Sequence, residues 1–478
     1  MTEGNNPVTG APPSATKNSF RFLQGKENII PPAERNLGTA GDAPQTDPEA
    51  EWQRQAGFAR GKLAQALNGR NIAFLFGSGT SSFSVKKSAE DGWVEHGIPT
   101  MKYLAEEFME LAAEDGATTE QRQKLVAAFG LDIADAAYAG NLERLMEKLI
   151  ALQFGFAKPV SASQQENEPS PNLAASPGAI APVGNALAAT DEVESVILKL
   201  RNFLVKKMST GLFSEGDTKV RDTYERFYRR LVFRERSLPR PWIFTTNYDL
   251  FSEQSLDRMG VSYSNGFSGT IDRRFNPAVY RYALAEEIDV GARKWSAVDG
   301  YLYLCKLHGS INWVAAKDGL YPVRELPGPP KAGEGDPIII YPTPAKQGFT
   351  LGTPYAELFR QFQERVVREQ SVLFVIGYSF SDDHVNNIIY QALSIPTFRL
   401  VIFSDPDTDG EIGRLRDLDD PRIWIVGGKR PDGQQAHYFA PMVDDLLPYL
   451  PSDRIDVALE KVLAMVGRQP RQGQGETE

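Results

Sequence analysis

The sequence predicts an α/β protein with a doubly wound parallel sheet and a helical insertion domain. Continuous apolar runs such as Ile72–Phe76 and Val372–Ile376 are typical of strands buried on both faces of a parallel sheet. These runs alternate with longer segments of helical periodicity, which is the pattern of a doubly wound sheet. Polar, glycine-containing clusters come directly after several strands. Because ligands bind beyond the carboxyl ends of strands in such sheets, these clusters form the candidate site.

The composition is that of a globular protein and excludes several classes. The chain has 478 residues, with 52 Lys and Arg against 62 Asp and Glu, and a net charge of −10. This acidic balance argues against a general nucleic-acid binder, since phosphate binding needs a basic surface. The single cysteine, Cys305, excludes a disulfide framework and a multi-cysteine zinc site and fits a reducing, cytoplasmic compartment. No apolar run approaches the roughly 18 residues of a membrane span, and the first residues lack a secretory pattern, so no membrane association is expected.

The N-terminal part of the chain divides into a polar region and a helix. Residues 1–47 are rich in Pro, Gly, Asn, Thr and Ala, so we expect them to be mostly disordered. Ser19–Gln24 is either part of this loose end or a segment that docks on a partner. Residues 48–68 have helical periodicity, and Asn68-Gly69 is a suitable helix end.

The middle of the chain reads as a helical insertion at residues 101–237. Helical patterns cover residues 100–156 and resume at Val193–Met208 and Thr223–Phe233. The segment 157–192 is rich in Pro, Ser, Ala and Asn, which predicts a flexible loop. The main α/β domain therefore comprises residues 48–100 and 238–450, followed by a C-terminal helix and polar tail at 451–478. The insertion is a candidate interaction surface or a lid over the site.

Strand patterns return after Pro241 and alternate with helices. The predicted strands are Trp242–Thr246, Ser262–Phe267, Tyr301–Leu307, Pro337–Tyr341, Val372–Ile376, Phe398–Phe403 and Ile423–Val426, with a helix at Tyr355–Glu369.

The first polar cluster is GSGTS, Gly77–Ser81, after the strand that ends at Phe76. Glycines at 77 and 79 permit positive φ and close ligand approach, and exposed amides in such a turn can hold phosphate. Neither a complete GxGxxG nor a Walker lysine follows, so nucleotide triphosphate hydrolysis is not indicated. A tight strand exit without a ligand is the alternative.

Two further clusters offer groups for catalysis. TTNYD, Thr245–Asp249, supplies an amide at Asn247 and a carboxylate at Asp249, either for a ligand or for an Asx-turn or helix cap. KLHGS supplies His308, whose imidazole can act as a general base near neutral pH or serve as a hydrogen-bonded structural side chain.

A fourth cluster, GYSFSDDH, Gly377–His384, follows the strand Val372–Ile376. Gly377 lets a ligand approach the backbone, and Ser379 and Ser381 can donate to phosphate or ribose. Asp382 either accepts ribose hydroxyls or caps the following helix.

In order, the motifs GSGTS, GIP, TTNYD, KLHGS and GYSFSD resemble the sirtuin superfamily, and most of all its bacterial sirtuin-like NAD hydrolases of antiphage defence. The resemblance covers residues 70–105 and 240–405 with gaps and implies a Rossmann-like NAD-binding fold. It implies that Asn247 positions water beside the nicotinamide ribose and that His308 is the general base. The residues that it implies for NAD binding are Gly77, Ser78, Gly79, Thr80, Ser81, Thr246, Asp249, Gly377, Ser379 and Asp382.

The departures from the family pattern bear on the substrate. The protein deacylases of the family carry a four-cysteine zinc module, which one cysteine cannot supply, so no zinc is expected. The segment between Ser81 and the GIP motif at Gly97 is much longer than in those enzymes, and Thr246 stands where they have Gln. These changes count against acyl-lysine peptide binding.

The resemblance implies a hydrolase that cleaves NAD to nicotinamide and ADP-ribose, as an NAD-depleting effector of antiphage defence. Such an activity needs control, which implies a homo-oligomer or a partner such as a HerA-like ATPase, a short Argonaute or a phage protein. Two other classes are open: a protein deacylase or ADP-ribosyltransferase, and a non-catalytic sensor of NAD or ADP-ribose.

Overall fold

The computed structural model describes residues 19–32, 47–86, 93–114, 116–138, 142–155, 190–209, 218–232, 234, 237–289, 294–298, 300–316, 323–331, 334–335, 337–339 and 354–449. The chain divides into two compact units. Unit 1 comprises Met1–Leu75, Arg226–Pro241 and Arg365–Glu478, and unit 2 comprises Phe76–Glu225 and Trp242–Glu364. The predicted C-terminal helix and most of the predicted flexible loop lie outside the described residues; the last residues of that loop segment, from Thr190, already belong to a helix.

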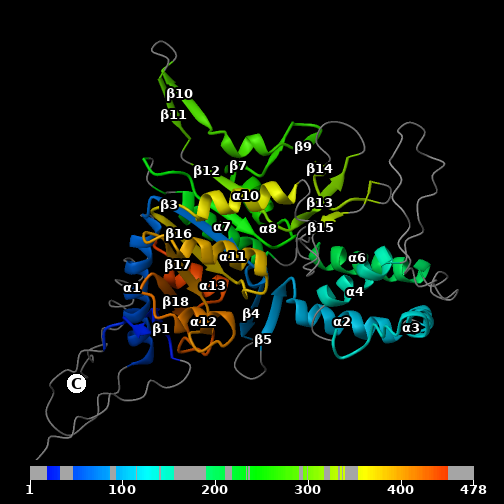
Figure 1. Ribbon diagram of the computed structural model, residues 1–478. Helices are drawn as coiled ribbons and strands as arrows, with labels where there is room; N and C mark the ends of the chain where they lie inside the picture. The colour runs from blue at the N-terminus through cyan, green and yellow to red at the C-terminus, as the bar shows by residue number, and fades with distance from the viewer. Residues whose placement is uncertain are drawn as a thin grey trace, which may run out of the picture. The chain divides into compact units, whose positions relative to one another are not determined.

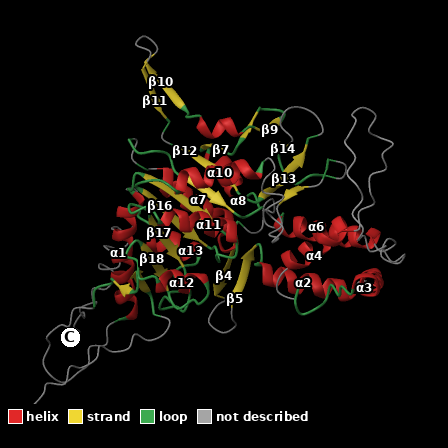
Figure 2. Ribbon diagram, in the orientation of Figure 1, coloured by secondary structure: helices red, strands yellow, loops and turns green. Residues whose placement is uncertain are grey.

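The fold is the predicted Rossmann-like α/β class, in which a large, mostly parallel sheet is flanked by helices. In unit 1 the strand order is β2-β1-β18-β17-β16-β3. These strands are β1 (Arg21–Gln24), β2 (Glu27–Asn28), β3 (Asn71–Phe76), β16 (Ser371–Ile376), β17 (Arg399–Phe403) and β18 (Ile423–Gly427). β16, β17 and β18 are parallel and lie side by side (Figure 2). Their continuous apolar runs are almost entirely buried, which is the reason that the sequence identified them.

The prediction that residues 1–47 are mostly disordered is wrong for the segment around β1. Arg21–Gln24 forms an antiparallel edge strand on β18, and Phe20, Phe22 and Leu23 are buried. Phe22 packs edge-to-face on Trp424 of β18. The burial of these three apolar side chains stabilises the strand despite the polar residues around it.

Helices pack around the strands of unit 1. α1 (Pro48–Leu67) begins after Asp47, whose side chain accepts a hydrogen bond from the Glu49 amide, and ends before Asn68, as predicted. Its small and apolar residues Trp52, Ala56, Ala59, Leu63 and Ala66 are buried. The other helical segments are α11 (Asp383–Leu393), α12 (Glu411–Asp417), α13 (Phe439–Pro441) and the π-helical turn Met442–Leu446.

Unit 2 contains a second set of parallel strands, ordered β6-β12-β7. These are β6 (Trp242–Thr245), β12 (Tyr301–Lys306) and β7 (Ser262–Ser264). The helix α8 (Phe251–Met259) follows β6, and α10 (Tyr355–Val366) has its residues up to Glu364 in this unit. Phe76, the last residue of β3, also belongs to unit 2, where its carbonyl accepts a hydrogen bond from the Thr246 amide at 3.0 Å.

A small antiparallel sheet in unit 2 was not predicted. Its strand order is β15-β13-β14-β9-β8. The strands are β8 (Phe267–Ser268), β9 (Arg273–Phe275), β13 (Gly309–Ala315), β14 (Val323–Glu325) and β15 (Pro337–Ile339). The sequence predicted a buried strand at Pro337–Tyr341, but β15 is only half-buried and pairs antiparallel with β13. A run of three isoleucines is too short to tell a core strand from an edge strand.

The described residues of the predicted insertion, 101–237, are mostly helical. α2 (Met101–Glu114), α3 (Gly116–Phe129), α4 (Leu142–Gly155) and α6 (Thr190–Met208) lie together in Figure 1. α7 (Lys219–Val232) follows, with its residues up to Glu225 in unit 2. Two hairpins complete the unit: β4 (Ser82–Lys86) with β5 (Trp93–Gly97), and β10 (Ala285–Asp289) with β11 (Lys294–Ala297). Across the described residues, no helix combines the length and apolar character that a membrane span requires.

Candidate functional site

The turn after β3 is a short 3-10 helix, Ser78–Thr80. The amide of Thr80 donates to the Gly77 carbonyl at 3.0 Å, and the amide of Ser81 donates to the Ser78 carbonyl at 3.1 Å. Glycine permits positive φ at positions 77 and 79, but Gly77 has a φ of −117° and Gly79 is not among the positive-φ glycines. Ser78 is exposed, whereas Thr80 and Ser81 are buried and direct their hydroxyls into a polar network.

This network joins the turn to Tyr224 of α7 and to Asn247. The Tyr224 hydroxyl lies 2.7 Å from Thr80 Oγ1 and 3.1 Å from Ser81 Oγ. The side-chain amide nitrogen of Asn247 lies 2.9 Å from the Gly77 carbonyl oxygen and 3.0 Å from the hydroxyls of both Thr80 and Ser81. Burial, helped by the negative charge of Asp249, raises the pKa of Tyr224 well above its usual value, so the phenol stays protonated.

The segment Thr245–Asp249 is held by its own turn bonds as well. Thr245 Oγ1 accepts from the Asn247 amide at 3.0 Å. Asp249 accepts from the Ser81 hydroxyl at 2.7 Å and from the Phe251 amide at 3.1 Å. Asp249 therefore forms the Asx-turn that the sequence allowed, and it still touches the glycine-containing turn. Both Asn247 and Asp249 are more than nine-tenths buried.

His308 lies in a loop that is bonded to the same segment. The Leu307 amide donates to the Thr245 carbonyl at 2.8 Å, and the Ile311 amide donates to the Tyr248 carbonyl at 3.1 Å. The His308 ring is buried, with ring centroids 6.3 Å from those of both Tyr248 and Phe359. Exits from β6 and β12 thus bring Asn247 and His308 to one end of the parallel strands of unit 2, as the strand-exit pattern predicted.

Steric crowding explains why a glycine follows His308. Gly309 has a φ of +87°, and a Cβ there would lie 2.2 Å from the Ile338 carbonyl oxygen. Only glycine fits this close approach, which lets β13 start directly after the histidine.

Lys306 supports this end of the strands from within. Its ammonium group is buried, lies 2.9 Å from Glu253 Oε1 and 2.9 Å from Ser310 Oγ, and donates to the Asp249 carbonyl. Burial raises the pKa of Glu253, against the opposing effect of the Lys306 charge. Sequence reasoning assigned no role to Lys306 or Tyr224. The charged Lys306 at the end of the otherwise apolar strand YLYLCK could have indicated a functional or ion-paired lysine. Tyr224 lies in a helix far from the motifs in the sequence, and no motif near it marks its hydroxyl.

The long segment between Ser81 and the GIP motif folds back on the turn. β4 and β5 pair so that Ser82 lies opposite Gly97, and the Ile98 amide donates to the Ser81 carbonyl at 2.8 Å. Gly97 has a φ of +82°, and a Cβ there would lie 2.1 Å from the Ser81 carbonyl oxygen. The hairpin therefore returns the chain to the turn despite the extra residues.

The remaining predicted residues lie in unit 1. Gly377 has a φ of +64°, and Ser379 is exposed. Asp382 is the N-cap of α11, accepting from the amides of His384 at 2.8 Å and Val385 at 3.4 Å, which is the capping interpretation. Within the described residues, no group of three His, Cys, Asp or Glu side chains is arranged to hold a metal ion.

Comparison with known proteins gives one family match. A model of the SIR2-like domain matches residues 241–416, which include Thr246, Asn247, Asp249 and His308. This match supports placing the region in the sirtuin-like superfamily. No curated protein matches the chain. Among solved structures, the chain is similar to a mutant Sir2 homologue in complex with ADP-ribose, at 13% identity and a TM-score of 0.26, covering 48% of this chain and 76% of that one.

Proposed function

We propose that the protein is a sirtuin-like NAD hydrolase that converts NAD and water to nicotinamide, ADP-ribose and a proton. The observation that carries the proposal is the buried network in which Asn247 joins the Gly77–Ser81 turn, next to the loop of His308. The SIR2-like match over residues 241–416 supports a role in NAD chemistry.

To cleave NAD, the protein mainly has to position the ribose and a water molecule and to supply a general base. Nicotinamide leaves as a neutral molecule from a cationic ring, so the glycosidic carbon becomes oxocarbenium-like as the bond breaks. The protein must hold the ribose and direct one water to its opposite face. In this proposal His308 accepts the proton of that water, and Asn247 orients the water or a ribose hydroxyl.

The two roles draw on the local geometry. The two hydrogens of the Asn247 amide nitrogen face the Gly77 carbonyl and the hydroxyls of Thr80 and Ser81, so the turn holds the amide in a fixed position. The His308 imidazole is buried beside aromatic rings, which limits competing bulk water.

Binding roles are proposed for the other residues. Gly77, Ser78, Gly79, Thr80 and Ser81 would contact the NAD phosphates, Thr246 would line the ribose, and Asp249 would accept from the nicotinamide carboxamide.

The finer biological role belongs to the same proposal. An enzyme that depletes NAD as an effector of antiphage defence must be held inactive until triggered, by self-assembly or by a partner such as a HerA-like ATPase, a short Argonaute or a phage protein.

The experiment is an end-point assay of the purified full chain with NAD, alone and with candidate partners, followed by separation of the products. Equal amounts of nicotinamide and ADP-ribose are expected. NAD loss that occurs only with an acylated peptide present, with the acyl group transferred, would replace this proposal by a deacylase.

A further inference from the structure

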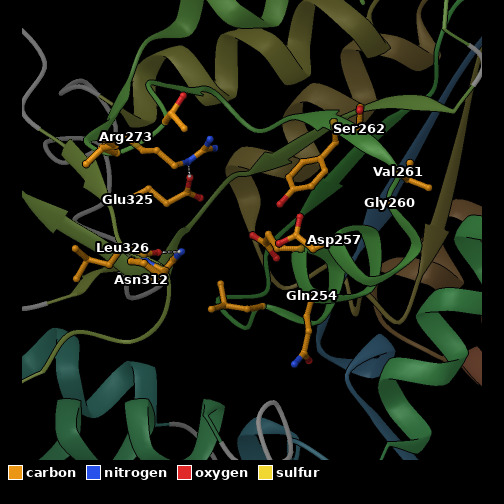
Figure 3. A pocket seen from close by; sticks show the side chains of 15 residues that line it. Gln254, Asp257, Gly260, Val261, Ser262, Arg273, Asn312, Glu325 and Leu326 are labelled. Atoms are coloured by element: carbon orange, nitrogen blue, oxygen red, sulfur yellow. Dashed lines mark hydrogen bonds and ion pairs between the residues drawn. The ribbon is translucent and has the colours of Figure 1, made fainter.

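Unit 2 contains a cavity whose lining differs from the residues proposed for NAD. Its volume is about 800 Å³, and its walls come from α8, from β7, from the loop before β9 and from the small antiparallel sheet. None of Gly77–Ser81, Asn247, Asp249 and His308 lines it. Figure 3 shows Asn312 and Glu325 on one side of the cavity and Asp257 on the other.

Two buried hydrogen-bond acceptors in this wall have no partner among the described residues. The amide nitrogen of Asn312 donates to the Leu326 carbonyl at 2.8 Å, which fixes the orientation of the amide and leaves Oδ1 unbonded. Glu253 directs Oε1 toward Lys306, and its Oε2 is unbonded. The two residues are 5% and 7% exposed. Buried acceptors of this kind cost free energy unless a donor reaches them, so the cavity is prepared for hydrogen-bond donors.

The charged side chains of the cavity indicate which kind of hydrogen-bond donor it would bind. Glu253, Asp257 and Glu325 contribute three carboxylates, and Arg273 is the one cationic side chain of the lining. Arg273 is already paired with Glu325 at 2.6 Å. Burial raises the pKa values of Glu253 and Glu325 although the charges of Lys306 and Arg273 lower them, and a further cation in the cavity would lower them more.

Part of the remaining lining is apolar and suits a short aliphatic chain. Leu250, Val261, Leu326 and Pro327 present apolar surface beside the acidic groups. Glu253 and Glu325 are already paired with Lys306 and Arg273, so an anion would be repelled chiefly by the carboxylate of Asp257. An apolar ligand would leave the two acceptors unbonded.

We propose that this cavity is a binding site for a small aliphatic cation with several N–H donors, an amine or guanidine. The ammonium or guanidinium group lies between Asn312 Oδ1 and the carboxylates of Glu253 and Asp257, and its carbon chain contacts the apolar lining. The site is independent of the NAD chemistry proposed above.

The test is isothermal titration calorimetry of the full chain with agmatine, which carries both groups. 1,4-Butanediol and glutarate are the neutral and anionic probes of similar length. Agmatine is expected to bind and the other two are not. Asn312→Leu and Asp257→Asn should each weaken agmatine binding by about tenfold or more. Glu110→Gln, an exposed acid on α2, is the matched control and should bind agmatine as the wild type does.

Asp257 is exposed on α8, so Asp257→Asn is expected to fold. This variant therefore tests the proposal even if Asn312→Leu fails to fold. Absence of agmatine binding, equal binding of butanediol, or unchanged affinity in a folded Asp257→Asn variant would each overturn the proposal. Because no NAD is present, a failure of the NAD hydrolase proposal leaves this result unaffected.

Discussion

The side-chain amide nitrogen of Asn247 lies 2.9 Å from the carbonyl oxygen of Gly77, so a buried hydrogen bond joins the turn after β6 to the turn after β3. The same nitrogen is 3.0 Å from the hydroxyls of Thr80 and Ser81. The geometry of both turns is therefore set by the protein before any ligand enters, which is what a positioning site requires.

Because Gly97 lies so close to Ser81, we expect a side chain at position 97 to destabilise the fold. Gly97→Ala places a methyl group against the Ser81 carbonyl and forces alanine to a φ of +82°. The variant should lose at least about 1–2 kcal/mol of unfolding free energy, measured by urea denaturation. Gly57→Ala on an exposed position of α1 has open space around it and should gain about 0.5–1 kcal/mol. A Gly97→Ala protein as stable as the wild type would contradict this view of the turn.

The hydroxyl of Tyr224 is expected to stabilise the network through Thr80 and Ser81. Tyr224→Phe keeps the ring packing but removes one partner from two buried hydroxyls. We expect a loss of about 1–3 kcal/mol in unfolding free energy, together with slower NAD hydrolysis. Tyr138→Phe, at a half-buried site outside the network, serves as control. An unchanged urea midpoint for Tyr224→Phe would mean that the network contributes nothing to the fold.

The buried pair of Lys306 and Glu253 predicts strong coupling. Lys306→Met leaves a buried carboxylate without its cation and should cost about 3–5 kcal/mol of unfolding free energy. Adding Glu253→Leu to the same chain should recover most of this loss, because the unpaired charge is then gone. The exposed pair of Arg414 and Glu411 offers a contrast, and Arg414→Met should cost less than about 1 kcal/mol. If the double variant is no more stable than Lys306→Met, the pair is not coupled.

His437 predicts a pH dependence of stability. Burial lowers its pKa from 6.5 to about 4, so the folded protein binds the proton less readily than the unfolded chain. Neutral His437 therefore favours the folded state fully above pH 6.5, and this contribution to the unfolding free energy is lost as the pH falls toward 4. This group alone should reduce the unfolding free energy by about 2 kcal/mol between pH 7 and pH 5. His437→Leu should show a correspondingly smaller decrease in urea denaturation at the two pH values, and an identical decrease would contradict the prediction.

The fold was predictable where strands are buried on both faces. The apolar runs at Ile72–Phe76 and Val372–Ile376 leave little alternative to a parallel sheet, and the structure has β3 and β16 there. β1 was missed because four residues of an edge strand carry almost no local signal, and its partner β18 lies about 400 residues later in the chain. The contact that decides such a strand is not local in the sequence.

The candidate site was predictable to a similar extent. Strand exits identified Asn247, Asp249 and the Gly77–Ser81 turn, and the structure brings them into one network. Tyr224 was not foreseeable, because a helical tyrosine usually packs in the core and nothing near it marks its hydroxyl. The β4–β5 hairpin was also missed, so the long spacing before Gly97 looked like a departure from the family pattern although the chain returns to Ser81.

In the proposed mechanism, Asn247 and His308 act together on NAD. The test compares the initial rate of nicotinamide release from NAD by the wild type, Asn247→Ala, His308→Ala and the control Glu110→Gln, in a preparation whose wild type is active. Asn247→Ala and His308→Ala are expected to slow release by about 10²–10⁴ while remaining folded, and the control is expected to keep the wild-type rate. Wild-type rates in both Asn247→Ala and His308→Ala would contradict the proposed joint role of these two residues.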